Sequence, residues 1–451
     1  MLLIWDIHAN ARHINAILDN MKSFVAKFSD EKNIIFLWDY MYMFSYDRQA
    51  LGDLFDFFLE LRENGKNVYI LTGNHDWLNQ HFVYHEGKKA LDMLSKQYSI
   101  RHSEQREESR EWQNNKMTKW LNKIHFIVEP EIHTIEDKEI LFMPYNKGFL
   151  GNYMNTFRHP ERSEESSKHL SFEAIAKNTS LPWDSSLHSE WREIITSETT
   201  HLLDSPNYNE QLSGALNHYL LQNYKPGMTL IHHYYTANIS FPGQQAKFDY
   251  KDISLHPGWT KYADNIISGH LHKAFIHENY LCAGSIRSTT SGERNQSKFL
   301  WKRDTKSDTY EAYEIAINPY ISVEWWENLT IDTLQNHIVT VQKEHISLLP
   351  NIQVHQTSYN LEKVSLILYS NDTVQDIENI IDPWLKASLG DIQLKQISSN
   401  HKDMTELLDI TQYNIKESLL DWKELVKKYL MSRYWPESEK YRTLLSELNI
   451  L

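Results

Sequence analysis

Five short segments combine histidine with aspartate or asparagine, which are residue types that bind transition metals. In chain order they are Asp6-Ile7-His8, Asp39, Asn74-His75-Asp76, His232-His233 and His270-Leu271-His272. Imidazole and carboxylate together suit borderline ions such as Mn²⁺, Fe or Zn²⁺, whereas sites of oxygen alone suit Mg²⁺ and Ca²⁺. Residues two positions apart on an extended segment, such as Asp6 and His8, present their side chains to one face. The pattern predicts a site for metal ions.

Each segment directly follows an apolar run that is typical of a β-strand. These runs are Leu2–Ile4, Asn33–Leu37, Asn67–Leu71, Met228–Ile231 and Asn265–Ser268. Helical spacing between the first three favours parallel strands with helices on the faces, and such sheets carry their sites at the carboxyl ends of the strands. A single pair would be weak support, since the chain has 23 histidines. Five segments in this position predict that their side chains converge.

The set resembles the calcineurin-like metallophosphoesterase family, whose pattern is Asp-x-His, Gly-Asp, Gly-Asn-His-Asp/Glu, His and Gly-His-x-His. The resemblance covers roughly residues 1–285 and implies an α/β fold, a β-sandwich flanked by helices. It also implies hydrolysis of a phosphate ester by a water activated between two divalent metal ions, Mn²⁺ or else Fe or Zn²⁺. One ion would be held by Asp6, His8, Asp39 and His272, and the other by Asp39, Asn74, His232 and His270, with Asp39 as the bridge.

The same resemblance assigns roles beside the metals. His75 would stabilise charge on the phosphate or protonate the leaving oxygen, and Asp76 would orient His75. Strand alternation lets only one residue of the His232-His233 pair point inward. We expect His232 to be the ligand, with His233 as the alternative.

Two tryptophans stand where the family carries small residues. Trp38 precedes Asp39 in place of Gly, and Trp5 precedes Asp6. Glycine is used where backbone must approach closely, so a bulky indole at such a turn is sterically awkward. The chain has 14 Trp and 14 Gly, whereas ordinary usage of ~7% would give roughly 30 Gly. One hypothesis is that several Trp codons are UGA read as Gly in the source organism.

A narrower resemblance concerns the stretch after the last histidine. Gly284-Ser285, Gly292-Glu293 and Lys298-Phe299 are similar to the Gly-Ser … Gly-Glu … Lys-Gly-Phe/Tyr stretch of SbcD-type DNA-repair exonucleases, although the Gly after Lys298 is missing. Those nucleases continue with a small α+β capping domain and with helices that dock on the coiled coil of an SMC-type ATPase. The resemblance therefore implies a DNA exo- or endonuclease that works with such an ATPase.

One residue counts against nuclease activity. The third residue after the bridging aspartate is His or Asp in many of these enzymes, and here it is Tyr42. A tyrosine, with a reference pKa of ~10, cannot supply the same acid/base chemistry near neutral pH. A phosphatase or phosphodiesterase acting on a nucleotide or phosphoprotein is the first alternative. A binding module with a degenerate metal site is the second, and the full set of expected ligands disfavours it.

Composition changes along the chain indicate three regions. Residues 1–320 form the predicted catalytic domain, with charged insertions at about 100–125 and 155–215 in which Arg101–Arg110 nearly recurs as Arg158–Ser167. Such segments bury little apolar surface, so we interpret them as solvated loops, with a substrate-gripping arm as the alternative. Residues 321–402 read as a small α+β module. The tail, 403–451, is helical, with Ile415, Leu419 and Trp422 on an a/d-like seam that indicates partner docking or packing on its own domain.

Overall composition says more about where the protein is located in the cell than about what it does. The formal net charge of −14 does not predict nucleic-acid binding and does not exclude it. No apolar run approaches the ~20 residues needed to cross a membrane, and Met1–Asp6 does not resemble a signal peptide. Cys282 is the single cysteine, which excludes an internal disulfide framework. We expect a cytoplasmic protein away from the membrane, with a homodimer left open.

The hypothesis about tryptophan can be tested on the protein itself. If UGA codons are read as Gly, mass spectrometry of the protein from its native source will show Gly at positions 5 and 38. A native peptide with Trp at position 38 would contradict it.

Overall fold

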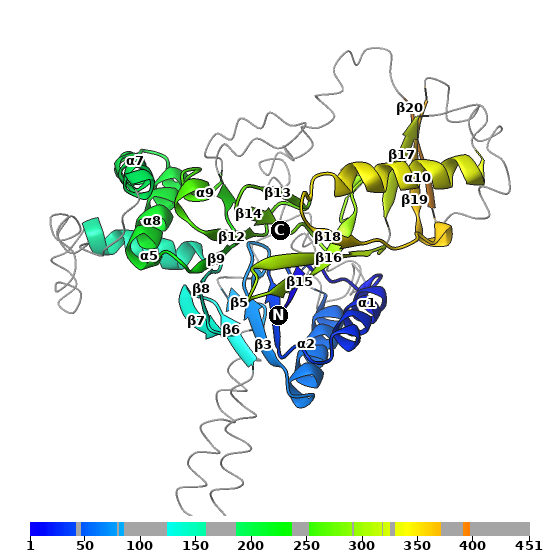
Figure 1. The fold of residues 1–451 in the computed structure, drawn as a ribbon, viewed down its shortest axis with the longest axis horizontal. Helices are drawn as coiled ribbons and strands as arrows, with labels where there is room; N and C mark the ends of the chain where they lie inside the picture. The colour runs from blue at the N-terminus through cyan, green and yellow to red at the C-terminus, as the bar shows by residue number, and fades with distance from the viewer. Residues whose placement is uncertain are drawn as a thin grey trace, which may run out of the picture. The chain divides into compact units, whose positions relative to one another are not determined.

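The computed structural model describes residues 1–41, 47–78, 81–84, 124–158, 186–236, 252–290, 293–317, 319–324, 330–370 and 391–396. The chain divides into two compact units, Met1–Tyr369 with Val374–Lys395, and Ser370–Thr373 with Gln396–Leu451. The first unit holds nearly all described residues, whose fold is drawn in Figure 1. Tyr42, the segment Arg101–Arg110 and the predicted tail helices lie outside the described residues. Among the described helices, none has the length and apolar character needed to cross a membrane.

The first large sheet has the strand order β18-β16-β15-β1-β2-β3-β6. Its parallel part is formed by β1 (Leu2–Trp5), β2 (Asn33–Leu37), β3 (Asn67–Leu71) and β6 (Ile124–Ile127). On the other side of β1 follow β15 (Lys298–Asp304), β16 (Thr309–Ile315) and β18 (Gln353–His355), with β15 antiparallel to both β1 and β16. β1, β2 and β3 match runs that the sequence predicts as strands, whereas β6 has no counterpart among the predicted strands.

The second large sheet has the order β13-β14-β12-β9-β8-β7. Four parallel strands form its centre: β14 (Tyr280–Cys282), β12 (Asn265–Ser268), β9 (Thr229–His232) and β8 (Lys138–Met143). The edge strands β13 (Phe275–His277) and β7 (Glu131–Ile135) are antiparallel to their neighbours. Two short pairs complete the described strands of this region, β4 (Trp77–Leu78) with β5 (His81–Phe82) and β10 (Tyr235–Thr236) with β11 (Ser254–Leu255).

Side-chain alternation along the strands places the two sheets face to face. In β2, Ile34 and Phe36 pack toward helices, whereas Ile35 and Leu37 join the core shared with Phe142 of the second sheet. Strands buried on both faces are typical of parallel sheets with covered faces. The result is a mixed α/β unit in which a core between the sheets fixes how their strand ends meet.

Helices cover the outer faces of the two sheets (Figure 1). The first sheet carries α1 (Ile14–Lys27) and α2 (Arg48–Glu63), which begins at Asp47, whose side chain accepts a hydrogen bond from the amide of Ala50. The core on the outer face of the second sheet includes residues of α5 (Lys147–Arg158), α7 (Ser186–Leu203), α8 (Tyr208–Asn223) and α9 (Trp259–Tyr262).

The interpretation of 155–215 as a solvated insertion is wrong for its described part. Residues 186–203 and 208–223 form α7 and α8, and these helices contribute buried side chains such as Ile195, Leu212 and Leu216 to the core. The apolar residues are spread among charged residues in α7 and among uncharged polar residues in α8, so the segment's polar composition concealed a buried helical stripe.

A small three-stranded sheet follows the two large ones. It has the order β17-β19-β20, with β17 (Tyr320–Glu324), β19 (Ser365–Ser370) and β20 (Asp391–Gln396). Helix α10 (Ile331–Ile346) packs on it through Leu334 and Ile338, after a capping box between Thr330 and Thr333. A 3₁₀ turn, Leu361–Lys363, precedes β19. The described part of residues 321–402 thus contains a helix and strands, while its extent as a separate module stays a prediction. Residues 325–329, 371–390 and 397–402 lie outside the described residues.

Candidate metal centre

The predicted ligands lie just beyond the carboxyl ends of parallel strands from both sheets. β1 leads into Asp6 and His8, β2 into Asp39, and β3 into Asn74, while β12 leads into His270 and His272. Two groups have ligand atoms within 4.8 Å of one another: Asp6, His8 and His272, and Asp6, Asp39 and His233. The fold therefore brings His8 and His272, 264 positions apart in the chain, to one point.

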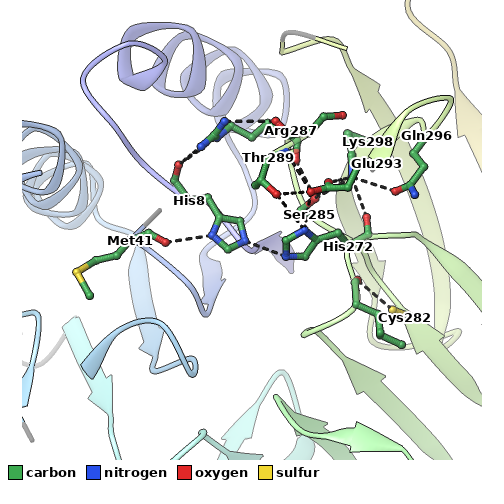
Figure 2. Close-up of polar contacts among 12 residues, drawn as sticks. His8, Met41, His272, Cys282, Ser285, Arg287, Thr289, Glu293, Gln296 and Lys298 are labelled. Atoms are coloured by element: carbon green, nitrogen blue, oxygen red, sulfur yellow. Dashed lines mark hydrogen bonds and ion pairs between the residues drawn. The ribbon is translucent and has the colours of Figure 1, made fainter. Parts of the chain in front are cut away.

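In the first group, two imidazole nitrogens face each other. The Nε2 atoms of His8 and His272 are 3.1 Å apart (Figure 2). His8 Nδ1 donates to the carbonyl of Met41 at 3.0 Å, and His272 Nδ1 donates to the carboxylate of Glu293 at 2.9 Å. A neutral imidazole that donates at Nδ1 has its lone pair at Nε2. Two lone pairs pointed at each other repel, and a metal ion bound by both nitrogens would remove that repulsion.

The second group surrounds His233. Its Nε2 lies 3.2 Å from Oδ2 of Asp39 and 2.7 Å from Oδ1 of Asn74, and its Nδ1 lies 3.9 Å from Oδ1 of Asp6. His270 joins through Nδ1, which is 3.3 Å from the same Asn74 oxygen. Asp6 is the residue common to both groups, whereas Asp39 belongs to the second. The bridging role of Asp39 therefore stays a prediction.

The structure brings His233, not His232, to the cluster. In β9 and just beyond it, Ile231 faces the core between the sheets and Leu230 faces the outer core, so His233 shares the side of Ile231. His232 points the other way, where its Nδ1 accepts from the amide of Tyr234 and its ring lies 6.1 Å from that of Tyr280. Alternation does select one histidine, but the strand has the opposite phase to the one expected, so that His233 and not His232 faces the cluster.

Asp6 presents a buried carboxylate whose charge is offset only in part by His233, with Nδ1 at 3.9 Å from Oδ1, and by Lys298. Within the described part of the chain, neither of its oxygens has a hydrogen-bond partner of normal geometry. Burial raises the pKa of Asp6 well above its usual value, and the nearby carboxylates of Asp39 and Asp76 raise it further. A bound cation would offset both effects, so the residues present fit a metal ion.

Two of the imidazoles, those of His8 and His270, favour the neutral form that binds metals. Burial lowers the pKa of His8 and of His270 well below the usual value, with the neighbouring His272 and His233 respectively adding to the effect. Burial alone would raise the pKa of Asp39, but His233 and His75 outweigh it and hold that pKa well below its ordinary value. The site thus combines a carboxylate that favours ionisation, Asp39, with two imidazoles that favour the neutral form, His8 and His270.

His75 is half-buried beside His8, whereas Asp76 is buried among backbone amides. The backbone amide of His75 donates to Oδ1 of Asp39 at 3.0 Å, and its ring lies edge-on to that of His8 with centroids 5.8 Å apart. Asp76 is buried and accepts from the backbone amides of Tyr40, Met41 and Gly73. Asp76 therefore ties the loop after β2 to the loop after β3, and its predicted orientation of the His75 ring stays a prediction.

Left-handed backbone is concentrated at the cluster. Positive φ angles occur at Asp6 (36°), His8 (47°), Trp38 (66°), Asp39 (46°) and His270 (73°). Each such conformation in a residue other than glycine costs about 1–3 kcal/mol and is typical of functional sites. At Gly73 an added Cβ would lie 2.1 Å from Oδ1 of Asp39, so glycine is required there.

Some contributors carried no signal that the sequence analysis could use. Arg287 is buried and donates through Nε and Nη2 to the carbonyl of His8, at 3.0 and 2.6 Å. Asp252 places Oδ2 3.7 Å from Nε2 of His270 and accepts from the hydroxyl of Tyr145. Neither residue belongs to a motif, and both reach the site only through the folded chain.

Comparisons with known proteins add no evidence on what this site does. No protein-family model matches the chain, and no curated protein matches it either.

The opposite orientations of the two adjacent histidines give a direct test. His233→Ala is expected to lose one of two bound metal ions, because its ring reaches Asp39 and Asn74. His232→Ala is the matched control, which is expected to keep both ions while lowering thermal stability, since it removes a buried ring. Metal content after dialysis and melting curves measure both effects. Loss of an ion from His232→Ala alone would contradict the assigned orientation.

Proposed function

We propose that this protein is a metal-dependent phosphoesterase that hydrolyses phosphodiester bonds in DNA. The observation that carries the proposal is the convergence of Asp6, His8 and His272 with Asp39 and His233 at one buried edge. Asp6, His8 and His272 would hold one divalent ion, and Asp39, Asn74, His233 and His270 the other. Two such ions supply Lewis acidity toward the ester and a nucleophile at neutral pH. The helix–sheet–sheet–helix layering supports the expected metallophosphoesterase sandwich.

The chain's own residues provide access and proton transfer. Four residues of the cluster are buried: Asp6, His8, Asp39 and His233. Four others are half-buried: Asn74, His75, His270 and His272. A substrate would therefore reach the cluster from the side of the half-buried residues. His75 lies on that side, fixed through its backbone to Asp39. Burial lowers the pKa of His75, although Asp39 opposes the shift. From that side the imidazole would hold charge on the phosphate or give a proton to the leaving oxygen.

Two observations support DNA as the substrate. Glu293 and Lys298, which carry the narrower resemblance to SbcD-type nucleases, contact His272. The small sheet with α10 follows the two large sheets in the order that this resemblance implies. A nucleotide or phosphoprotein phosphatase remains the alternative outcome of the assay.

The function and the role of His75 are tested together. With Mn²⁺ the unaltered protein is expected to degrade linear DNA and a small phosphodiester. His75→Ala is expected to lower turnover about 10²–10⁴-fold while both ions stay bound. His277→Ala, a change at an exposed histidine, is the control and should match the parent. Hydrolysis of phosphomonoesters with no action on DNA would replace the nuclease proposal with the phosphatase, and loss of a metal from His75→Ala would make His75 a ligand.

The proposed partner is a coiled-coil ATPase of the SMC type, bound by the tail. Ending the chain after Lys402 should leave hydrolysis of a small diester intact, because every proposed ligand precedes residue 273. The same truncation should abolish capture of the ATPase in a pull-down, since the apolar seam of Ile415, Leu419 and Trp422 gains most by burial against a partner helix. Lower thermal stability with unchanged capture would instead mean that the tail packs on its own chain.

A further inference from the structure

Glu293 contacts His272 on the side away from the cluster. One carboxylate oxygen, Oε1, accepts from Nδ1 of His272 at 2.9 Å and from the amide of Thr289 at 3.1 Å. The hydroxyl of Thr289 donates to the same oxygen. The hydrogen bond at Nδ1 therefore fixes the orientation of the His272 ring, and Nε2 of that ring faces His8 (Figure 2).

Lys298 contacts both Glu293 and the backbone of His272. Its Nζ donates to Oε2 of Glu293 at 2.7 Å and to the backbone carbonyl of His272 at 2.9 Å, with a further bond to Ser285 at 2.9 Å. A closed chain of hydrogen bonds results: the ring of His272 contacts Glu293, Glu293 contacts Lys298, and Lys298 contacts the backbone carbonyl of His272. Both charged residues are buried, with exposed fractions of 7% for Glu293 and 4% for Lys298. A buried ion pair is a poor source of stability, so its presence beside a ligand points to a positional role.

We propose that Glu293 and Lys298 are a positioning pair that fixes the His272 ring and thereby sets the affinity of one metal site. This inference rests on the proposed function, since it concerns the site that His8 and His272 share. Partners that donate or accept at the second nitrogen of a ligand histidine fix its tautomer and ring direction, and their loss typically lowers metal affinity about 10–100-fold.

The chain offers a matched control in another Glu–Lys–His group. Glu311 lies 3.1 Å from Nε2 of His355 and 3.3 Å from Nζ of Lys302, on β16 and its neighbours. None of these residues belongs to the metal-capable groups. Equivalent changes there remove similar contacts without touching the proposed site.

The experiment compares two double variants of the full chain. Glu293→Gln/Lys298→Met removes both charges, so no buried charge is left unpaired, and keeps an acceptor for His272. Glu293→Leu/Lys298→Met removes that acceptor at similar side-chain size. Titration of the metal-free proteins with Mn²⁺, followed by electron paramagnetic resonance of the free ion, measures affinity at each site. The corresponding changes at Glu311 and Lys302 are the controls.

We expect the Leu variant to bind Mn²⁺ about 10–100-fold more weakly than the Gln variant at one site, with equal affinity at the other and similar melting temperatures of the metal-free forms. Equal affinities for the two variants, or losses that follow melting temperature in both, would overturn the proposal. Glu293→Asp is the safeguard if the Leu variant does not fold, because it keeps the charge but withdraws the carboxylate from Nδ1. Parent-like affinity of Glu293→Asp would equally overturn it. An unaltered protein that binds no Mn²⁺ or Zn²⁺ would refute the proposed function itself.

Discussion

The burial of Asp6 and Asp39 in one cluster is the constraint on which the arrangement depends. Taking a carboxylate out of water costs several kcal/mol unless opposite charge and hydrogen bonds replace the solvent. Here the surroundings are mostly imidazoles and backbone amides, and Asp6 has no hydrogen-bond partner of normal geometry among the described residues. Because burial raises the pKa of Asp6 while nearby histidines outweigh burial at Asp39, the pair divides into a carboxyl that resists ionisation and one that favours it. A divalent cation is the partner that this arrangement accommodates.

Holding these groups together requires backbone that strands alone do not provide. The loops after β1 and β2 remain paired beyond the sheet, since the amide of His8 donates to the carbonyl of Asp39 at 2.7 Å. Asp76 links the second loop to the third, and Arg287 holds the carbonyl of His8. These bonds stabilise the left-handed residues of the cluster, whose conformations would otherwise relax. Strain at the ligands is thus opposed by contacts from residues that need not bind metal.

The sequence alone predicts most of the parallel strands and most of the cluster, because both follow from local pattern, whereas β6 was missed. An apolar run followed by Asp39 or Asn74 predicts a ligand at a strand end wherever the strand lies in the sheet. The orientation of His232 could not be derived in this way, since the phase of β9 depends on which of its faces packs between the sheets. The helices α7 and α8 were missed for a related reason, as polar and charged residues separate the apolar ones that they bury. Arg287 and Asp252 reach the site through tertiary structure alone.

The high tryptophan content of the chain has a structural counterpart at two positions, Trp5 and Trp38. Trp301 and Trp259 are buried, yet their indole N–H groups donate to the carbonyl of Ala283 and to Asn217. Trp5 and Trp38 are equally buried, but within the described residues their N–H groups have no acceptor, which costs about 1–3 kcal/mol each. Trp38 also has a left-handed φ of 66°, a conformation that suits glycine. The two positions where a small residue was expected are those where the fold leaves the indole unsatisfied, so the same physical conflict underlies both observations.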